Sequence, residues 1–278
     1  MNDSQAPPPK PPSTPPPKPN PLLGPPPMTE PQPRGKRKNA LDAYVGLPET
    51  GWTGWVVLAG VAVAIVLLGI GTLIPAIFDP GLETTAGRDA AQFGVGLALG
   101  GTALIFAFMD AGGRLRPALT RLGLSGLRPV LWRTLGMAAL AWLAYLAVAR
   151  LAVPLLQPEQ QDVTNELGTD ENSALGIVVA AILIIGIAPL AEELFFRGFM
   201  FAGLRRALPL WPAALLSALV WGSLHLGGGN VGVAIQLSIF GVILAWLYER
   251  SGTLWAPIFA HTLNNTIAFT LLVTGVDA

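Results

Sequence analysis

The sequence predicts an all-α protein built as a polytopic membrane helix bundle, and three observations support this prediction. Of the 278 residues, 52% are hydrophobic and only 12% are charged, and the mean hydropathy is +0.54. A soluble domain carries about 25% charged residues, so this composition is typical of a chain that crosses a bilayer several times. Apolar stretches of ~20 residues, the length that a spanning helix requires, recur along the chain. The charged residues gather between those stretches.

Residues 1–40 form a different kind of segment. Nearly half of the first 33 residues are proline, and a basic group follows at 34–38. Such a composition offers too little apolar surface to offset the entropy of ordering, so we expect a disordered tail with polyproline II character. Its PxxP-like runs suit a docking partner, although a purely solvated tail explains the composition as well. The transmembrane helical domain is therefore predicted at 41–278.

Seven apolar segments are predicted to cross the membrane, and an eighth, re-entrant element stays open. The first contains Pro75 and several glycines, which membrane helices tolerate. The third carries Arg133 and Arg150 near its ends, from where their long side chains can reach the interfaces. The fifth is short, and the tight link 227–230 after it predicts a hairpin with the sixth. The seven segments are about 52–78, 91–109, 130–155, 174–204, 210–226, 231–248 and 254–275.

The distribution of basic residues predicts the orientation. Lysine and arginine near helix ends mark the cytoplasmic side. Almost all of them lie before the first segment or after the second, fourth and sixth, which is the side of the amino terminus. The opposite link, 157–173, contains acidic residues and no basic one. We therefore expect a multi-pass protein of the cell membrane with a cytoplasmic amino terminus.

The composition also excludes several classes of site. The chain contains no cysteine, so disulfides, thiolate metal ligands and a cysteine nucleophile are ruled out. Its basic residues do not alternate with aromatic ones in a pattern typical of nucleic-acid binding. We therefore expect the lipid bilayer as its surroundings and no nucleic-acid partner.

A pair of glutamates and an arginine interrupt the fourth segment. Residues 172–191 contain no charge, and Glu192, Glu193 and Arg197 then follow together. Ionisable residues inside a bilayer are costly and usually functional. Glu193 and Arg197 are four residues apart and can pair on one helix face, whereas Glu192 points about 100° away. One carboxylate is thus incompletely neutralised, which suits a general base or acid. A structural ion pair at the cytoplasmic interface is the alternative.

His225 in the fifth segment is expected near Glu192. The two residues lie at similar distances from the turn 207–210, so both should stand ~20 Å above it at ~1.5 Å per residue. Trp221 precedes His225 by four residues and could form a wall of the site. A hydrogen-bonded histidine of the core is the alternative.

His261 and Asn265 in the seventh segment are also four residues apart and share a face. At ~1.5 Å per residue they reach the same layer as the glutamates. The neighbouring Asn264 points about 100° away. For this residue we expect a hydrogen bond between helices, which is common among polar side chains in membranes.

Together these six residues suit hydrolysis of an amide bond. A carboxylate and a histidine can hold and deprotonate a water molecule, and a histidine with an asparagine can stabilise an oxyanion. Two histidines and a glutamate could instead bind catalytic zinc, although the helical motif HExxH is absent. A proton-coupled transporter could use the same groups as a relay. The chain shows no repeated half with paired broken helices, the usual mark of such a transporter.

The motifs that hold these residues resemble the CAAX-protease and bacteriocin-processing family of intramembrane proteases, the Abi family, which includes the Rce-type CAAX endopeptidases. The family is recognised by EExxxR, FxxxH and HxxxN on separate helices. Here EExxxR is Glu192–Arg197, FxxxH appears as Trp221–His225 with tryptophan in place of phenylalanine, and HxxxN is His261–Asn265. The resemblance covers about 174–272.

This resemblance implies a membrane-embedded endopeptidase that acts on a membrane-associated protein or peptide. It implies that Glu192 and His225 activate water, that His261 and Asn265 form the oxyanion hole, and that Glu193 and Arg197 orient Glu192. It implies a mechanism without a metal, with zinc as the minority alternative. Some members of the family are immunity proteins or non-proteolytic scaffolds, and the sequence does not name the substrate.

Overall fold

The computed structural model describes residues 46–124, 126, 131–158, 174–227 and 230–274. All of them belong to one unit, Tyr44–Ala278. Every regular element among the described residues is a helix, as the composition predicts. The proline-rich tail predicted at 1–40 and most of the acidic link at 157–173 lie outside the described residues.

Helices α1 (Gly54–Phe78) and α2 (Thr85–Asp110) lie side by side. Their closest approach is at Gly71 and Gly94, where a Cβ on either glycine would collide with the other backbone. Helix α2 begins six residues earlier than the hydropathy predicts. The Thr84 hydroxyl accepts a hydrogen bond from the Gly87 N–H, and this cap starts the helix with a polar turn that an apolar pattern does not reveal.

Helix α3 (Leu115–Arg121) is a seven-residue helix that the sequence analysis does not predict. It is too short to cross a bilayer. Gly123 follows it with a φ of 82°, and its carbonyl accepts hydrogen bonds from the Leu254 N–H and the Thr253 hydroxyl. These bonds tie the loop to the turn between the last two helices. The long helix α4 (Leu131–Leu156) comes next.

The fourth predicted segment is one continuous helical run whose winding changes along its length. It comprises α6 (Ala174–Ala181), η4 (Ile182–Ile187), α7 (Ala188–Glu193), η5 (Leu194–Phe201) and α8 (Ala202–Leu204). Both η segments are wider π-helical turns, which are frequent at functional sites. Pro189 supplies a cause for the first of them, because proline cannot donate a backbone hydrogen bond inside a helix.

Helix α9 (Leu210–Ser223) continues into a 3₁₀ turn, η6 (Leu224–Gly227), and helices α10 (Val231–Ser251) and α11 (Trp255–Thr274) follow. The expected hairpin is present, because α9 and α10 pack against each other. Gly222 faces Ser238, and Gly241 faces Ala218, so small residues line the crossing on both helices. Such residues allow membrane helices to approach closely.

Six helices of the described chain are long and apolar enough to cross a membrane, which makes this a multi-pass membrane protein. They correspond to six of the seven predicted segments. The other segment forms the shorter apolar helix Leu210–Leu226. The count of seven crossings stays a prediction for this reason.

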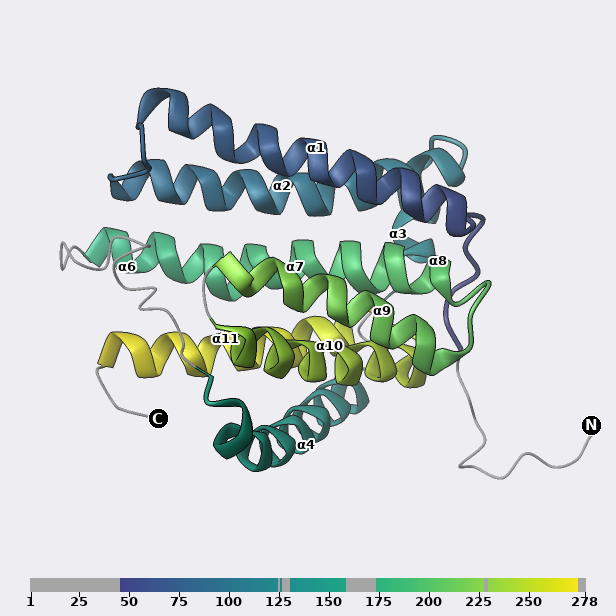
Figure 1. The fold of residues 1–278 in the computed structure, drawn as a ribbon. Coiled ribbons are helices and arrows are strands. Elements are labelled where there is room, and N and C mark those ends of the chain that lie inside the picture. Colours follow the sequence, from purple (N-terminus) through teal and green to yellow (C-terminus); the bar gives the residue numbers. More distant parts are fainter. Residues whose placement is uncertain (1–45, 125, 127–130, 159–173, 228–229, 275–278) are drawn as a thin grey trace, which may run out of the picture. The chain divides into compact units, whose positions relative to one another are not determined.

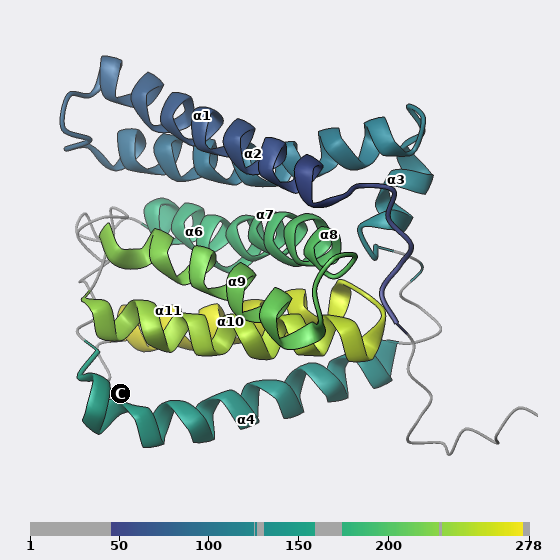
Figure 2. The ribbon, with the colours of Figure 1, turned by 45° about the vertical axis from the view of Figure 1, so that its right-hand side comes forward.

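Figures 1 and 2 show the order of the helices within the described unit. The α1–α2 pair lies at one edge and α4 at the opposite edge. The α6–α8 run packs against α2, and α10 and α11 lie between that run and α4. The middle of α6–α8 is therefore enclosed by other helices on several sides. Its residues 193–203 are all buried, and Glu193 and Arg197 are among them.

Candidate active site

The centre of the site is an ion pair within one helix. Arg197 Nη1 lies 2.7 Å from Glu193 Oε1, and the two side chains are 1% and 0% exposed. Sequence spacing alone predicts this contact, since the residues are four apart. The same Glu193 oxygen accepts a second hydrogen bond from His261 Nδ1 of α11, at 2.9 Å. Glu193 thus joins the fourth segment to the last helix.

Arg197 also contacts the α9–α10 hairpin. Its Nη2 donates to the Gly241 carbonyl at 3.3 Å. Its guanidinium lies over the Trp221 ring, with Cζ 4.7 Å from the ring centroid. A guanidinium binds favourably to the face of an indole, more so where water is excluded. Arg197 therefore links Glu193, α9 and α10 at one point.

Glu192 is the more accessible carboxylate, with 15% of its side chain exposed. Its Oε2 accepts a hydrogen bond of 2.6 Å from Trp221 Nε1 and lies 3.9 Å from His261 Nε2. The spacing of Trp221 and His225 predicts only a wall of the site at Trp221 and does not reveal this hydrogen bond. The signal was available, because tryptophan has an N–H donor that phenylalanine at the same motif position lacks.

His225 lies beside this cluster, against the ring of Trp221. Helix α9 ends at Ser223, so His225 falls in the 3₁₀ turn η6, where the backbone rises faster per residue than in an α-helix. Its ring packs edge-on against Trp221 with centroids 5.2 Å apart. Among the hydrogen bonds and ion pairs of the described residues, none joins His225 to Glu192. Trp221 contacts both side chains.

The tautomer of His225 follows from its hydrogen bond. Nδ1 lies 3.0 Å from the Trp221 carbonyl oxygen, which can only accept, so Nδ1 carries the proton. Nε2 of the neutral ring then has a free lone pair. Such a nitrogen can accept a proton from water.

His261 is buried among aromatic rings. It is 3% exposed, and its ring packs edge-on against Trp221 and Phe240, with centroid separations of 5.3 and 6.0 Å. Its Nδ1 faces Glu193 and its Nε2 faces Glu192. The rings fix the orientation of the imidazole between the two carboxylates.

Asn265 contacts the helix break caused by Pro189. The Ala188 N–H bonds to the carbonyl of Leu183, five residues back, which is π-helical pairing. In that pattern the next donor would serve Ile184, but it is Pro189, which has no N–H. Asn265 Nδ2 instead donates to the Ile184 carbonyl at 3.0 Å. One of its two N–H groups is thus used for the backbone, and the second remains.

The neighbouring Asn264 makes the contact between helices that its position predicts. Its Oδ1 accepts from Trp142 Nε1 of α4, at 3.4 Å. It also approaches Asn265, with Nδ2 3.4 Å from Asn265 Oδ1. Asn264 therefore links α4 and α11.

The donor set fits a metal ion only in part. Glu192 Oε2 and His261 Nε2 lie close together, but His261 Nδ1 and His225 Nδ1 already have partners. Within the described ranges, no three histidine, aspartate or glutamate side chains gather closely enough to hold a metal ion. The dependence on zinc stays a question for experiment.

The six predicted residues thus lie on α7, η5, η6 and α11, and five of them share one network with Trp221 at its centre. Asn265 lies outside this network and bonds to the Ile184 carbonyl.

All six residues fall within the stretch that a comparison with protein families recognises. Residues 174–267 match the Rce1-like family. This family is described as type II CAAX prenyl endopeptidase Rce1-like, and the match confirms the resemblance that the three motifs indicate.

Individual relatives match part of the chain. "Putative membrane peptidase YdiL" of Bacillus subtilis is 32% identical over 92 residues, which are 33% of this chain and 35% of the relative. The human CAAX prenyl protease 2 is 31% identical over 108 residues, 33% of each chain. The uncharacterized protein YyaK of Bacillus subtilis is 24% identical over 141 residues, 48% of this chain and 46% of the relative.

The chain therefore spans between a third and a half of the length of these curated relatives. No solved structure gives a significant match. The likeness to the Rce1-like family concerns the segment with the charged network, and helices α1 to α4 lie outside the family match.

Proposed function

We propose that this protein is an intramembrane endopeptidase of the CAAX-protease type. The observation that supports this proposal best is the network in which Glu192 lies within reach of His261 and is held by Trp221. The residues of this network lie in the part of the chain that matches the Rce1-like family. The names of two relatives, a CAAX prenyl protease and a membrane peptidase, agree with hydrolysis of a peptide bond.

Glu192 and His225 activate the water in this mechanism. Glu192 is the partly exposed carboxylate, and His225 has Nε2 free to accept a proton. The water oxygen attacks the carbonyl carbon of the scissile peptide and loses one proton to this pair. When the C–N bond breaks, the same pair returns that proton to the leaving nitrogen. The products are an amine and a carboxylic acid, and the acid releases the second proton of the water when it ionises.

His261 and Asn265 stabilise the oxyanion. A His261 protonated on both nitrogens donates from Nδ1 to Glu193 and keeps the Nε2–H for the substrate oxygen. In that state Arg197 and His261 balance the charges of the two glutamates, so the enclosed network carries no net charge. Asn265 supplies its second N–H, while the first remains on the Ile184 carbonyl.

Glu193, Arg197 and Trp221 position the reacting groups. Glu193 fixes the His261 ring through Nδ1, and Arg197 neutralises Glu193. Trp221 orients Glu192 through its indole and stacks its face on Arg197. The substrate is a membrane-associated protein or peptide, whose scissile bond must reach Glu192 within the bundle. The protein works in the cell membrane with its amino terminus in the cytoplasm, where the proline-rich tail is available to a docking partner.

A cleavage assay on the purified full-length protein tests the proposal. The protein is reconstituted in lipid and mixed with a library of membrane-anchored peptides, and mass spectrometry identifies the products. Wild type should cleave, Glu192→Gln should not, and Glu83→Gln, which changes an exposed carboxylate of the α1–α2 loop, should cleave normally. Normal cleavage by Glu192→Gln would overturn the mechanism. Binding of peptides without cleavage by wild type would instead favour a non-proteolytic scaffold or immunity protein.

Metal analysis of the active preparation is the companion experiment. The proposal expects full activity after treatment with a chelator. If chelation removes stoichiometric zinc and abolishes cleavage, and added zinc restores it, then His225, His261 and a glutamate act as metal ligands.

A further inference from the structure

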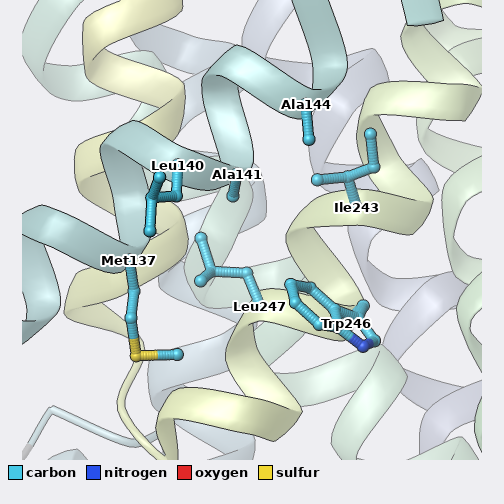
Figure 3. Close-up of a pocket in the computed structure, with 7 residues that line it drawn as sticks. All are labelled: Met137, Leu140, Ala141, Ala144, Ile243, Trp246 and Leu247. Carbon is cyan, nitrogen blue, oxygen red and sulfur yellow. The ribbon is translucent and has the colours of Figure 1, made fainter.

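A groove lies on the outer side of the bundle between α4 and α10. Its volume is about 240 Å³, and its lining side chains are aliphatic apart from Met137 and the indole of Trp246. Met137 and Ala144 of α4 lie opposite Ile243 and Trp246 of α10. Figure 3 shows the α4 side chains along one side of the groove and the α10 side chains along the other. Both helices are long enough to span the membrane, and Ala144 is exposed. The groove therefore opens toward the hydrocarbon of the bilayer.

Two arginines stand at one end of this groove. The Arg250 guanidinium lies over the Trp246 ring, with Cζ 5.8 Å from the centroid. Arg133 precedes Met137 by four residues in α4, so it lies on the same helix face one turn further out. The two helices run in opposite directions here, since Met137 near the start of α4 and Leu247 near the end of α10 line the same groove. Arg133 and Arg250 are therefore at the same end.

These two arginines differ from most others in the described chain. Arg121, Arg197 and Arg205 each pair with a carboxylate, and Arg88, Arg114 and Arg206 donate to backbone carbonyls. Arg133 and Arg250 are exposed, and neither guanidinium has an ion pair or hydrogen bond to another described residue. Two uncompensated positive charges thus border an apolar groove.

We propose that this groove binds one anionic phospholipid, with an acyl chain between α4 and α10 and the headgroup phosphate between Arg133 and Arg250. The apolar lining matches a hydrocarbon chain, and the two arginines match a phosphate in charge and in hydrogen-bonding geometry. Both arginines lie at the end that the distribution of basic residues assigns to the cytoplasm, where anionic lipids are enriched. The site is separate from the Glu192 network and does not depend on the proposed proteolysis.

Native mass spectrometry of the full-length protein, released from bilayers of equal phosphatidylglycerol and phosphatidylcholine, tests the proposal. Wild type should retain one phosphatidylglycerol in preference to phosphatidylcholine. The double variant Arg133→Gln/Arg250→Gln should retain it roughly 25-fold less, since each basic residue near an anionic lipid contributes on the order of fivefold. Arg150→Gln changes another exposed arginine, near the opposite end of α4, and should behave as wild type.

A second pair of variants tests the acyl-chain part of the site. Ala144→Leu fills the groove and should lower retention, whereas Ala147→Leu, at an exposed position of α4 that does not line the groove, should not. Equal retention of the two lipids by wild type, or loss in Arg150→Gln equal to that in the double variant, would overturn the proposal. If Ala144→Leu leaves lipid retention unchanged but abolishes binding of a prenylated peptide, the groove binds the substrate instead.

Discussion

Trp221 holds the carboxylate of Glu192 through a hydrogen bond of 2.6 Å between Nε1 and Oε2. The same indole lies under the Arg197 guanidinium and packs edge-on against both histidines. One side chain of α9 thus contacts four of the six residues proposed to carry out the reaction. In the family pattern phenylalanine stands at this position, and it could pack in the same place but could not donate a hydrogen bond.

Replacing Trp221 with phenylalanine should therefore lower kcat while the protein stays folded. A hydrogen bond to a charged group contributes about 1.5–3 kcal/mol, so we expect a loss of roughly 10- to 100-fold. Steady-state kinetics on the cleaved peptide measures it. Trp211→Phe is the matched control, because Trp211 is exposed at the start of the same helix. Equal activity of the two variants would show that the indole hydrogen bond has no role.

Removing Arg197 should destabilise the protein as well as inactivate it. Glu193 is 0% exposed, and Arg197→Ala would leave its charge buried with only His261 to balance it. Breaking a buried pair typically costs about 3–5 kcal/mol. Thermal unfolding in detergent should show a large decrease in Tm.

The double variant Glu193→Gln/Arg197→Met separates stability from catalysis. It removes both charges, so Tm should recover much of the loss while cleavage stays absent. A double variant as unstable as Arg197→Ala would mean that packing, and not the unpaired charge, determines the effect.

Asn265→Ala should lower kcat by ~10²–10³, the usual effect of removing one oxyanion donor. Asn264→Ala should be mild, because its side chain lies 3.4 Å from Trp142 and links α4 to α11. The comparison requires kcat and KM for both variants. Equal impairment would contradict the assignment of the two asparagines.

Substitutions at Asn265 and Pro189 should have non-additive effects on the free energy of unfolding. In the native chain Asn265 donates to the Ile184 carbonyl that Pro189 cannot serve. Pro189→Ala restores a backbone N–H, so Asn265→Ala should cost less in that background, with a coupling energy of about 1 kcal/mol. A double-mutant cycle on unfolding free energies measures it, and Asn264→Ala should be additive with Pro189→Ala. Full additivity of Asn265→Ala would refute this account of the helix break.

The orientation can be measured directly, because the chain contains no cysteine. Glu83→Cys lies in the α1–α2 loop and Ala207→Cys in the turn before α9, and both positions are exposed. A thiol reagent that does not cross membranes should label the first from outside intact cells. The second should react only after the membrane is opened. The reverse pattern would reject a cytoplasmic amino terminus.

The sequence predicts the helices well, because a chain inside hydrocarbon must satisfy its backbone hydrogen bonds internally and an uninterrupted apolar run can do so only as a helix. The ends of the helices are less predictable. The start of α2 depends on the Thr84 cap, and α3 is too short to leave a hydropathy signal. The π-helical segment η4 follows from Pro189 only after the partner of the Ile184 carbonyl is known.

Some contacts within the site also follow from the sequence, and others do not. Glu193 and Arg197 are on one helix, so their pairing follows from spacing. The position of His261 between Glu192 and Glu193 depends on how α11 packs against α7, and no periodicity encodes that packing. Helical rise brings α9 to the level of Glu192, but it does not reveal that α9 ends at Ser223 and that Trp221, rather than His225, makes the contact.

The pairing of Glu193 with Arg197 inside a single helix has a consequence for how the protein enters the membrane. A charged side chain at the centre of a spanning helix costs about 2.5–3.5 kcal/mol on insertion scales. Because these two charges are neighbours on one helix face, segment 174–204 can neutralise them as soon as it is helical, before any other helix is present. Glu192 and His261 meet only when α11 arrives. Insertion of the fourth helix can therefore precede assembly of the site, and α11, which is synthesised later, completes it.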